Sequence, residues 1–438
     1  MIKKLLIVFL ALIAFTSYAQ EDAASPYSFY GIGSLKFKGT VENQSMGGLS
    51  IFSDSIHVNL RNPASYAGKN LEIYGNKSRP VKFTVGGSHS TAKLKSNSGE
   101  DRYNSSTFDY IALSIPMNKF GFGFGLLPYT SVGYKLETYG ANGIETRFRG
   151  EGGVNKAFLS LGYQITDNLS AGIDVNYNFG NIQNKTLAFS YNSDDELTRY
   201  QTREDNRSDL SGFNINLGVI YKRKITDKLE LTSAATYTPK TKLNSRNQRY
   251  FNTIAYNTSL QQEFIVNTIE ANLDANGLKE TELVMPAKLS VGAGIGQPRK
   301  WFVGAEYTFQ KTSDFSNELY NASQSAVATN YKNASNFSLG GFFIPEYNSF
   351  SSYLKRVVYR AGVRFGNTGL SINNEDINEF GISFGLGLPV GNAFSNANLG
   401  IEVGEKGTIN NNLIQENFVN INLSLSLNDR WFVKRKYN

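Results

Sequence analysis

Residues 169–180 read LSAGIDVNYNFG, a stretch in which apolar and polar residues alternate strictly. Because successive side chains of a β-strand point to opposite faces, this pattern predicts a strand with one apolar face and one polar face. The same alternation recurs in FNINLGVIYK at 213–222 and in VVYRAGVRF at 357–365. We therefore expect an all-β protein whose strands separate an apolar surrounding from a polar one.

Alternation alone fits both a soluble β-sandwich and a transmembrane β-barrel. The predicted strands are roughly 9 to 13 residues long, which suits a tilted membrane crossing and exceeds the usual five or six. Their connections alternate between short ones and long polar ones such as 181–209 and 240–281, as a barrel with tight turns on one side and long loops on the other requires. The short connections are 116–119, 165–168, 225–228, 297–300 and 389–392.

The polar faces also carry charges, among them Asp174, Glu306, Arg360 and Arg364. An arginine that faced lipid near the bilayer midplane would cost about 2 to 4 kcal/mol. A watery or protein-filled lumen removes that cost, so these charges favour the barrel over the sandwich.

These criteria predict about fourteen antiparallel transmembrane strands. They span 80–91, 106–117, 120–135, 155–164, 168–180, 210–223, 228–239, 281–296, 300–310, 335–344, 355–366, 378–389, 393–404 and 417–427. An even number of strands places both ends of the chain on the same side, which for an exported protein is the periplasm. The expected location is the outer membrane of a Gram-negative bacterium, reached with the help of the barrel-assembly machinery.

The amino terminus has the layout of a secretory signal peptide over residues 1–19. Lys3 and Lys4 precede an apolar run from Leu5 to Phe15, and small residues end at Ala19. Removing this segment lowers the formal net charge from +7 to +5, and no dense basic run indicates nucleic acid. The chain contains no cysteine, which excludes disulfides and thiolate metal sites.

Residues 20–79 alternate weakly and are expected to form a compact hatch inside the lumen of the barrel, which would occupy 80–438 with a short basic tail at 428–438. Within the hatch, Asn62, Pro63 and Ala64 form an Asn-Pro-Ala sequence. The chain here resembles the FadL family of outer-membrane transporters for long-chain fatty acids and other hydrophobic compounds. That resemblance implies a fourteen-stranded barrel closed by an amino-terminal hatch that carries this motif.

The resemblance also draws attention to the third predicted strand, which contains GFGFGLLPYTSVGY at 121–134. We expect its phenylalanines to face lipid and Gly121, Gly123 and Gly125 to allow a close approach of the hatch. Pro128 cannot donate to a central ladder and predicts a local break. In the FadL family a kink in the third strand opens the wall sideways, which implies a lateral exit at Pro128. The chain also resembles FadL-related barrels with segments like Ser25–Gly33 and Met46–Gly48.

These features lead to an expected role in uptake of long-chain fatty acids or other hydrophobic molecules, with outer-membrane lipids as partners. Arg360 and Arg364 are candidate holders of a carboxylate, and pairing with acids or carbonyls of the lumen is the alternative. A second hypothesis is a non-transporting accessory barrel of an outer-membrane secretion or protein-assembly complex. The long segment 240–281 would then contact protein partners.

The sequence does not favour an enzyme. His57 and His89 are the two histidines, and no Gly-x-Ser-x-Gly elbow accompanies them, so we expect polar surface or lumen residues. An outer-membrane phospholipase is the least implausible enzymatic alternative. The acidic stretch 192–197 matches no calcium loop, and we predict neither a metal nor a cofactor.

Overall fold

The computed structural model describes residues 25–36, 38–54, 56–68, 80–257, 259–260, 262–317, 329–390 and 395–429. The predicted signal peptide and residues 430–438 of the predicted tail lie outside the described residues, as does the boundary between hatch and barrel near residue 79.

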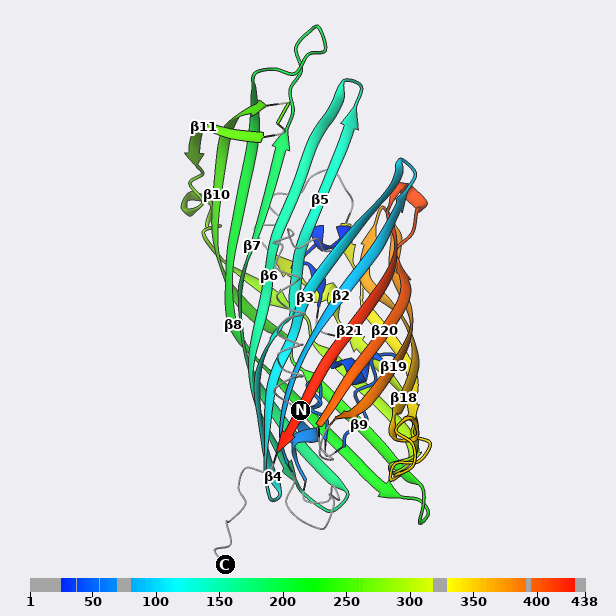
Figure 1. Ribbon diagram of the computed structural model, residues 1–438. Helices are drawn as coiled ribbons and strands as arrows, with labels where there is room; N and C mark the ends of the chain where they lie inside the picture. Colours follow the sequence, from blue (N-terminus) through cyan, green and yellow to red (C-terminus); the bar gives the residue numbers. More distant parts are fainter. Residues whose placement is uncertain are drawn as a thin grey trace, which may run out of the picture.

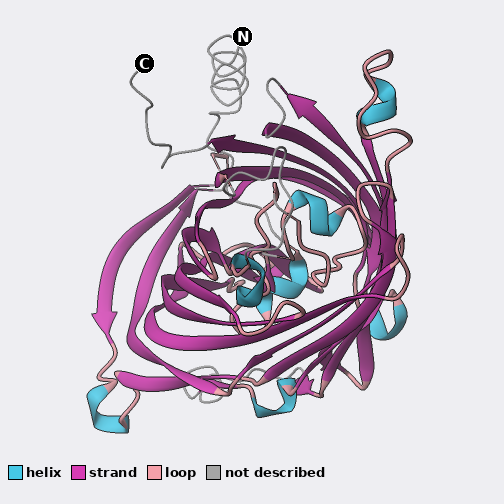
Figure 2. Ribbon diagram, turned by 90° about the horizontal axis from the view of Figure 1, so that it is seen from below, coloured by secondary structure: helices cyan, strands magenta, loops and turns pink. Residues whose placement is uncertain are grey.

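Fourteen antiparallel strand positions close into a tilted barrel, which confirms the predicted fold class (Figures 1 and 2). The ring closes where β21 pairs with β2, from Val81 opposite Asp429 to Lys95 opposite Gln415. At several of these fourteen positions, two strands that are consecutive in the sequence lie end to end and together form one strand of the ring. In ring order the strands are β2 Val81–Ser96, β3 Gly99–Met117, β4 Phe120–Pro128 with β5 Thr130–Gly140, β6 Gly143–Gln164, β7 Leu169–Ala188, β8 Tyr200–Lys224, β9 Glu230–Thr238 with β10 Thr241–Asn257, β12 Glu280–Met285 with β13 Lys288–Gln297, β14 Trp301–Gln310 with β15 Ser316–Asn317, β16 Thr329–Tyr331 with β17 Ala334–Phe343, β18 Val358–Ile372, β19 Glu375–Val390, β20 Ser395–Lys406 and β21 Gln415–Asp429.

The two faces of the wall follow the alternation of the sequence. On β7, Ile173 and Val175 are exposed on the outside, while Asp174 and Asn176 are buried in the lumen. Equivalent exposed apolar residues on the other strands form a girdle around the barrel, and on β8 it ends at Phe213. An exposed apolar band of this kind is what a bilayer requires.

The long polar segments predicted as loops are largely strand, so that prediction was wrong. β7 and β8 continue as a paired ladder up to Ala188 opposite Thr202, through most of 181–209. Beyond the girdle the outer face carries charged residues such as Arg207 and Asp209, and only scattered apolar residues such as Ile182 and Leu187 are buried. The regular apolar alternation that marks a strand therefore disappears although the backbone pairing continues. The short connections at 118–119, 165–168 and 225–229 define what we call the short-turn end of the barrel, and the opposite end is the far end.

The segment 240–281 likewise contains two strands. β10 continues the seventh position at the far end, and β11 Gln262–Glu270 folds back to pair with it. In Figure 1, β10 and β11 lie at the margin of a tall wall that rises above the rest of the barrel. Among the described residues the connections also contain the short 3-10 turns η4 Asp274–Asn276, η5 Thr312–Asp314, η6 Leu354–Arg356 and η7 Asn410–Asn412. Within the described residues, no helix has the length and apolar character needed to cross a membrane.

The described residues between 25 and 68 lie inside the barrel, where the hatch was expected (Figure 2). They contain η1 Pro26–Phe29, the two-residue strand β1 Ser34–Leu35, the helix α2 Val41–Gln44 and η2 Pro63–Tyr66. Thr40 and Asn43 form a reciprocal capping box that starts α2. The hatch therefore has little regular structure of its own, and its contacts with the wall hold its shape.

Candidate functional site

The Asn-Pro-Ala segment forms the start of a short turn that is fixed to the wall. The side chain of Asn62 accepts a hydrogen bond from the Ala64 amide at 3.0 Å, which caps η2. Its amide nitrogen donates to the carbonyl of Val219 on β8 at 3.2 Å. Pro63 occupies the first helical position, where its missing N–H costs nothing. The motif thus both shapes the turn and anchors it to the barrel.

The wall beneath this turn is made of glycines that are register partners on four adjacent strands. Gly121 of β4 lies opposite Gly162 of β6, which lies opposite Gly172 of β7, which lies opposite Gly218 of β8. A methyl group added at any of them would collide with backbone or side-chain atoms of residues 62–67. This row lets the hatch backbone approach the wall more closely than any side chain would permit.

The three glycines of the 121–125 stretch do not have equal roles. Added side chains at Gly121 and Gly123 would collide with Tyr66 of the hatch, as predicted. At Gly125 the neighbours are the carbonyl of Ile111 and the ring of Phe158, both in the barrel wall. The predicted approach of the hatch therefore applies to two of the three positions.

A second docking row receives the Met46–Gly48 segment on the opposite wall. Gly340 of β17 and Gly362 of β18 lie in register, and both leave room for the backbone at residues 46–47. The amide of Gly47 donates to Ser383 Oγ on β19 at 2.9 Å. Glycine rows on two sides of the lumen therefore hold the hatch between them.

The wall is discontinuous near Pro128. β3 pairs with β4 from Met117 only as far as Ile111, although it continues pairing with β2 to Gly99. β5, which follows β4 after Tyr129, pairs with β6 but with no strand of the barrel on its other side among the described residues. The predicted break in the third strand is therefore present, and above it the edges of β3 and β5 are not joined (Figure 1).

Two features that the sequence analysis did not single out accompany this break. β3 carries an extra residue, Asp109, between the residues that pair with Gly86 and Gly87, and this bulge lies where the pairing with β4 ends. Opposite the end of β4, β6 contains Gly152 and Gly153, whose φ angles are +112° and +148°. Such angles are accessible to glycine and rare for other residues, so the pair allows β6 to bend beside the break.

The hatch occupies the start of the unpaired edge of β5. Ser34 and Leu35 of β1 lie antiparallel to Ser131 and Thr130, and the amide of Lys36 donates to the carbonyl of Tyr129 at 3.0 Å. The Leu35 side chain is 44% exposed. The hatch thus adds a short strand to the wall at the position where the barrel strand is missing.

The preceding segment, Ser25–Gly33, crosses the lumen from this edge to the opposite wall. On one side Phe29 packs edge-on against Tyr134 of β5, with ring centroids 5.0 Å apart. On the other side the Tyr27 hydroxyl donates to the carbonyl of Ile414 at 2.5 Å, and Ser25 donates to the Glu416 carboxylate. Burial and the nearby Glu416 carboxylate raise the pKa of the Tyr27 hydroxyl well above its ordinary value. We call residues 25–33 the strap.

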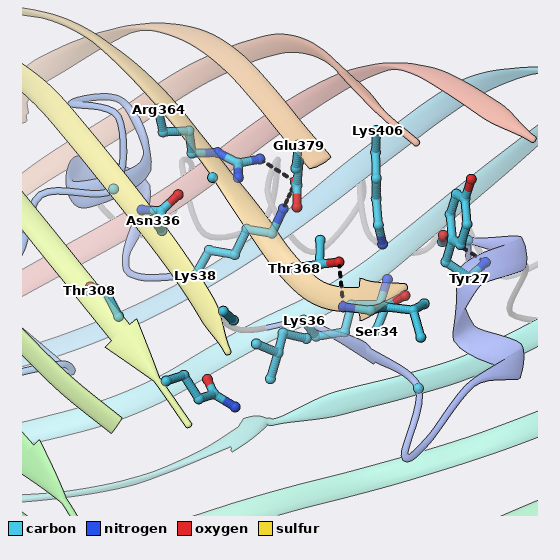
Figure 3. Close-up of a pocket in the computed structure, with 18 of the residues that line it drawn as sticks. Tyr27, Ser34, Lys36, Lys38, Thr308, Asn336, Arg364, Thr368, Glu379 and Lys406 are labelled. Carbon is cyan, nitrogen blue, oxygen red and sulfur yellow. Dashed lines mark hydrogen bonds and ion pairs between the residues drawn. The ribbon is translucent and has the colours of Figure 1, made fainter. Parts of the chain in front are cut away.

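Between the hatch and the far end lies a cavity of about 430 Å³ (Figure 3). Its lining combines apolar and aromatic residues with a cluster of charges. Arg364 of β18 contacts Glu379 at 2.6 Å and Glu402 at 2.5 Å, and Lys38 of the hatch contacts Glu379 at 2.5 Å. Lys406 points into the same space. The charges neutralise one another in a network that joins the hatch to β18, β19 and β20.

The two predicted arginines do not act together. Arg364 lines the cavity and is paired with two carboxylates, which is the alternative that the sequence analysis gave. Arg360 is buried on the same strand, closer to the short-turn end. There its guanidinium donates to Asn398 Oδ1 at 3.1 Å. Sequence alternation identified the lumen face correctly but could not give these partners, because they depend on strand register.

A profile of the BamG family matches residues 1–438. The chain belongs to the BamG family. A search of curated proteins found no match.

Solved structures similar to this BamG-family chain are channels and transporters. The toluene transporter TodX of Pseudomonas putida is 17% identical, with 92% of this chain and 100% of that chain covered and a TM-score of 0.56. The toluene transporter TbuX of Ralstonia pickettii is 15% identical, with coverage of 91% and 99% and a TM-score of 0.56. A FadL homologue of Pseudomonas aeruginosa is 13% identical, with coverage of 91% and 99% and a TM-score of 0.56. The BamG-family chain therefore has the FadL-type fold, and with its apolar girdle it belongs in the outer membrane.

The two histidines of the BamG-family chain are in separate places. His57 lies in the hatch with Nδ1 2.7 Å from Asp54 Oδ2, whereas His89 is exposed on β2 and contacts Ser106 Oγ at 2.8 Å. Burial alone would raise the pKa of Asp54, but the neighbouring His57 and Lys82 hold it below the ordinary range. Among the described residues no group of acidic and histidine side chains could hold a metal ion.

Proposed function

We propose that this protein is an accessory barrel subunit of an outer-membrane protein-assembly complex, and that it has no catalytic role. Membership of the BamG family supports an association with barrel assembly, because the family name follows that of the barrel-assembly (Bam) machinery. The observation that carries the proposal against transport is the ion-paired network in the cavity, which Lys38 of the hatch forms with Glu379 and which Arg364 and Glu402 extend along the wall. Much of the lining is apolar, with Ile32, Phe315 and Leu370 among its residues, but a hydrophobic molecule that crossed the cavity would have to pass these charged groups.

The docking of the hatch also supports an accessory role. Residues 25–68 contact glycine rows on two walls, and β1 fills part of the edge at which an exit would open. Moving the hatch would break backbone contacts on both sides of the lumen.

Native mass spectrometry of the protein extracted gently from its own outer membrane tests this proposal. We expect a defined mass that includes other proteins in fixed ratio and no retained fatty acid. A bare barrel that carries a fatty acid or another hydrophobic molecule would overturn it.

A second candidate function is uptake of long-chain fatty acids or other hydrophobic molecules with exit between β3 and β5, and the discontinuity of the wall favours it. Substrate would then leave past Pro128 after Ser34 and Leu35 separate from β5. The chain has no cysteine, so the variant Ser34→Cys/Ser131→Cys can form one disulfide across this pair. Oxidation would abolish uptake of a labelled fatty acid if this exit is used, and Ser34→Cys alone is the control.

The orientation that we propose follows from export. Residues 1–19 would act as a signal peptide, both ends of the mature chain would be periplasmic, and the far end would face the outside of the cell. Residues 20–79 would act as the hatch of a barrel over 80–438, with the basic tail at 428–438 in the periplasm.

A further inference from the structure

The strand β11 has an exposed edge at the far end of the tall wall. Its residues pair with Tyr250–Asn257 of β10, and among the described residues no strand pairs with its other edge. An unpaired edge presents a row of backbone N–H and C=O groups that can hydrogen-bond to another extended chain.

The side chains of β11 are apolar although they are exposed. Phe264, Ile265, Val266 and Ile269 are each more than half exposed. Ile269 lies opposite Phe251 of β10, which is also exposed, so the apolar surface extends onto the neighbouring strand. Natural proteins protect free edges with lysine, proline or very short strands. The sequence QEFIVNTIE of β11 contains neither lysine nor proline and runs for nine residues.

Lipid does not cover this surface, because β11 lies far above the apolar girdle. On β8 the girdle ends at Phe213, and the same face then carries Asp209 and Arg207, which form an ion pair of 2.9 Å in water. β11 is level with Tyr200–Asp205 of β8 through their common neighbour β10. At about 3.3 Å per residue and a tilt of about 45°, that is roughly 20 to 30 Å beyond the girdle.

We propose that β11 is a docking strand for an extended segment of another protein of the complex, which pairs with its free edge and covers the apolar side chains of residues 264–269. This inference rests on the proposed accessory role. The charges of β11 define the partner further. Glu263 is bound by Arg203 at 2.8 Å, whereas Glu270 is exposed and has no ion-pair partner among the described residues. The partner segment therefore carries alternating apolar residues and a lysine or arginine opposite Glu270.

The experiment compares complexes extracted from cells that express the wild-type chain, the variant Phe264→Glu/Ile269→Glu, or the control Tyr139→Glu. Tyr139 is also an exposed ring at the far end, on β5, so its change places a negative charge elsewhere at this end, one charge where the β11 variant adds two. The gel shift on heating, which reports a folded barrel, shows whether each variant folds. Native mass spectrometry gives the composition, and hydrogen exchange of residues 262–270 is measured in the wild-type complex and in the isolated barrel.

We expect the β11 variant to fold and to lose a partner that the wild type and the control retain. In the wild-type complex the amides of residues 262–270 should exchange at least about tenfold more slowly than in the isolated barrel. If every partner stays bound to the β11 variant and these amides exchange equally in both samples, β11 is not the docking strand and the accessory role still stands. If the wild type has no partner, the proposed function itself fails. A mass of two copies of this chain alone would overturn the proposal of a different protein partner.

Discussion

Leu35 of the hatch and Thr130 of the barrel wall are register partners in a short antiparallel pair, so the hatch supplies strand structure at the point where the wall is interrupted. The neighbouring strands do not provide it, because β3 pairs with β4 only as far as Ile111 and β5 begins beyond the break. The hatch thus extends the hydrogen-bonded sheet at the free edge of β5, while β3 stays unjoined to it.

The glycine row beneath the Asn-Pro-Ala turn predicts a large effect from a single methyl group. In Gly172→Ala the added carbon would collide with the backbone of Pro63 and Ala64. We expect overpacking to destabilise the docked hatch by about 1 to 3 kcal/mol while the barrel still forms. The measurement is the rate at which protease cleaves within residues 56–68. Gly140→Ala is the matched control, because an added carbon there makes only ordinary contacts, and equal cleavage of the two variants would contradict the prediction.

The charge network of the cavity predicts strong and non-additive effects. Arg364→Met leaves the carboxylates of Glu379 and Glu402 close together without their shared cation, so we expect a loss of roughly 3 to 5 kcal/mol in the free energy of unfolding. The triple variant Arg364→Met/Glu379→Gln/Glu402→Gln should recover most of that loss. Unfolding in urea measures both effects.

The surface variant Arg207→Met is the control for that experiment. Arg207 and Asp209 form an ion pair of 2.9 Å, but both side chains are 44% exposed. Exposed pairs contribute at most about 1 kcal/mol. If Arg207→Met and Arg364→Met had the same effect, the network in the lumen would not have the stabilising role that we assign to it.

The strap predicts a dependence of stability on alkaline pH. Burial raises the pKa of the Tyr27 hydroxyl in the folded protein, so its contribution to stability is complete below the ordinary tyrosine pKa of about 10 and is lost as the pH rises above it. Tyr27→Phe removes the hydrogen bond to Ile414 and should cost about 1 kcal/mol at pH 8. The difference in unfolding free energy between wild type and variant should shrink above pH 10. A difference that does not change with pH would contradict this assignment.

How much of this site the sequence could predict depends on what lies on the two sides of each strand. Within the girdle, lipid and lumen differ, so Ile173 and Asp174 point to opposite sides and the alternation shows it. Beyond the girdle the outer face no longer meets lipid, and residues 181–188 pair as a strand in which only Ile182 and Leu187 are buried apolar residues, so no regular alternation marks it. The partners of Arg364 could not be predicted from the sequence for a different reason. Glu379 and Glu402 lie 15 and 38 residues away along the chain, and only the register of three strands brings them together.

The break in the barrel wall could also be predicted only in part from the sequence. Pro128 was identifiable because proline lacks a donor, but the bulge at Asp109 leaves no sign in the composition. On one side Pro128 still pairs in register with Asn155 of β6. On its other side it has no partner, because the pairing of β3 with β4 has already ended. The proline is therefore compatible with an edge that is already free.

Pro128→Val alone should then leave the break open. We expect a change in unfolding free energy below about 1 kcal/mol and no new protection of the amides of residues 99–107 in hydrogen exchange. Deleting Asp109 removes the extra residue of β3, so the combination of this deletion with Pro128→Val should lengthen the pairing of β3 beyond Ile111 and protect some of these amides. Protection in Pro128→Val by itself would show instead that the proline alone causes the break.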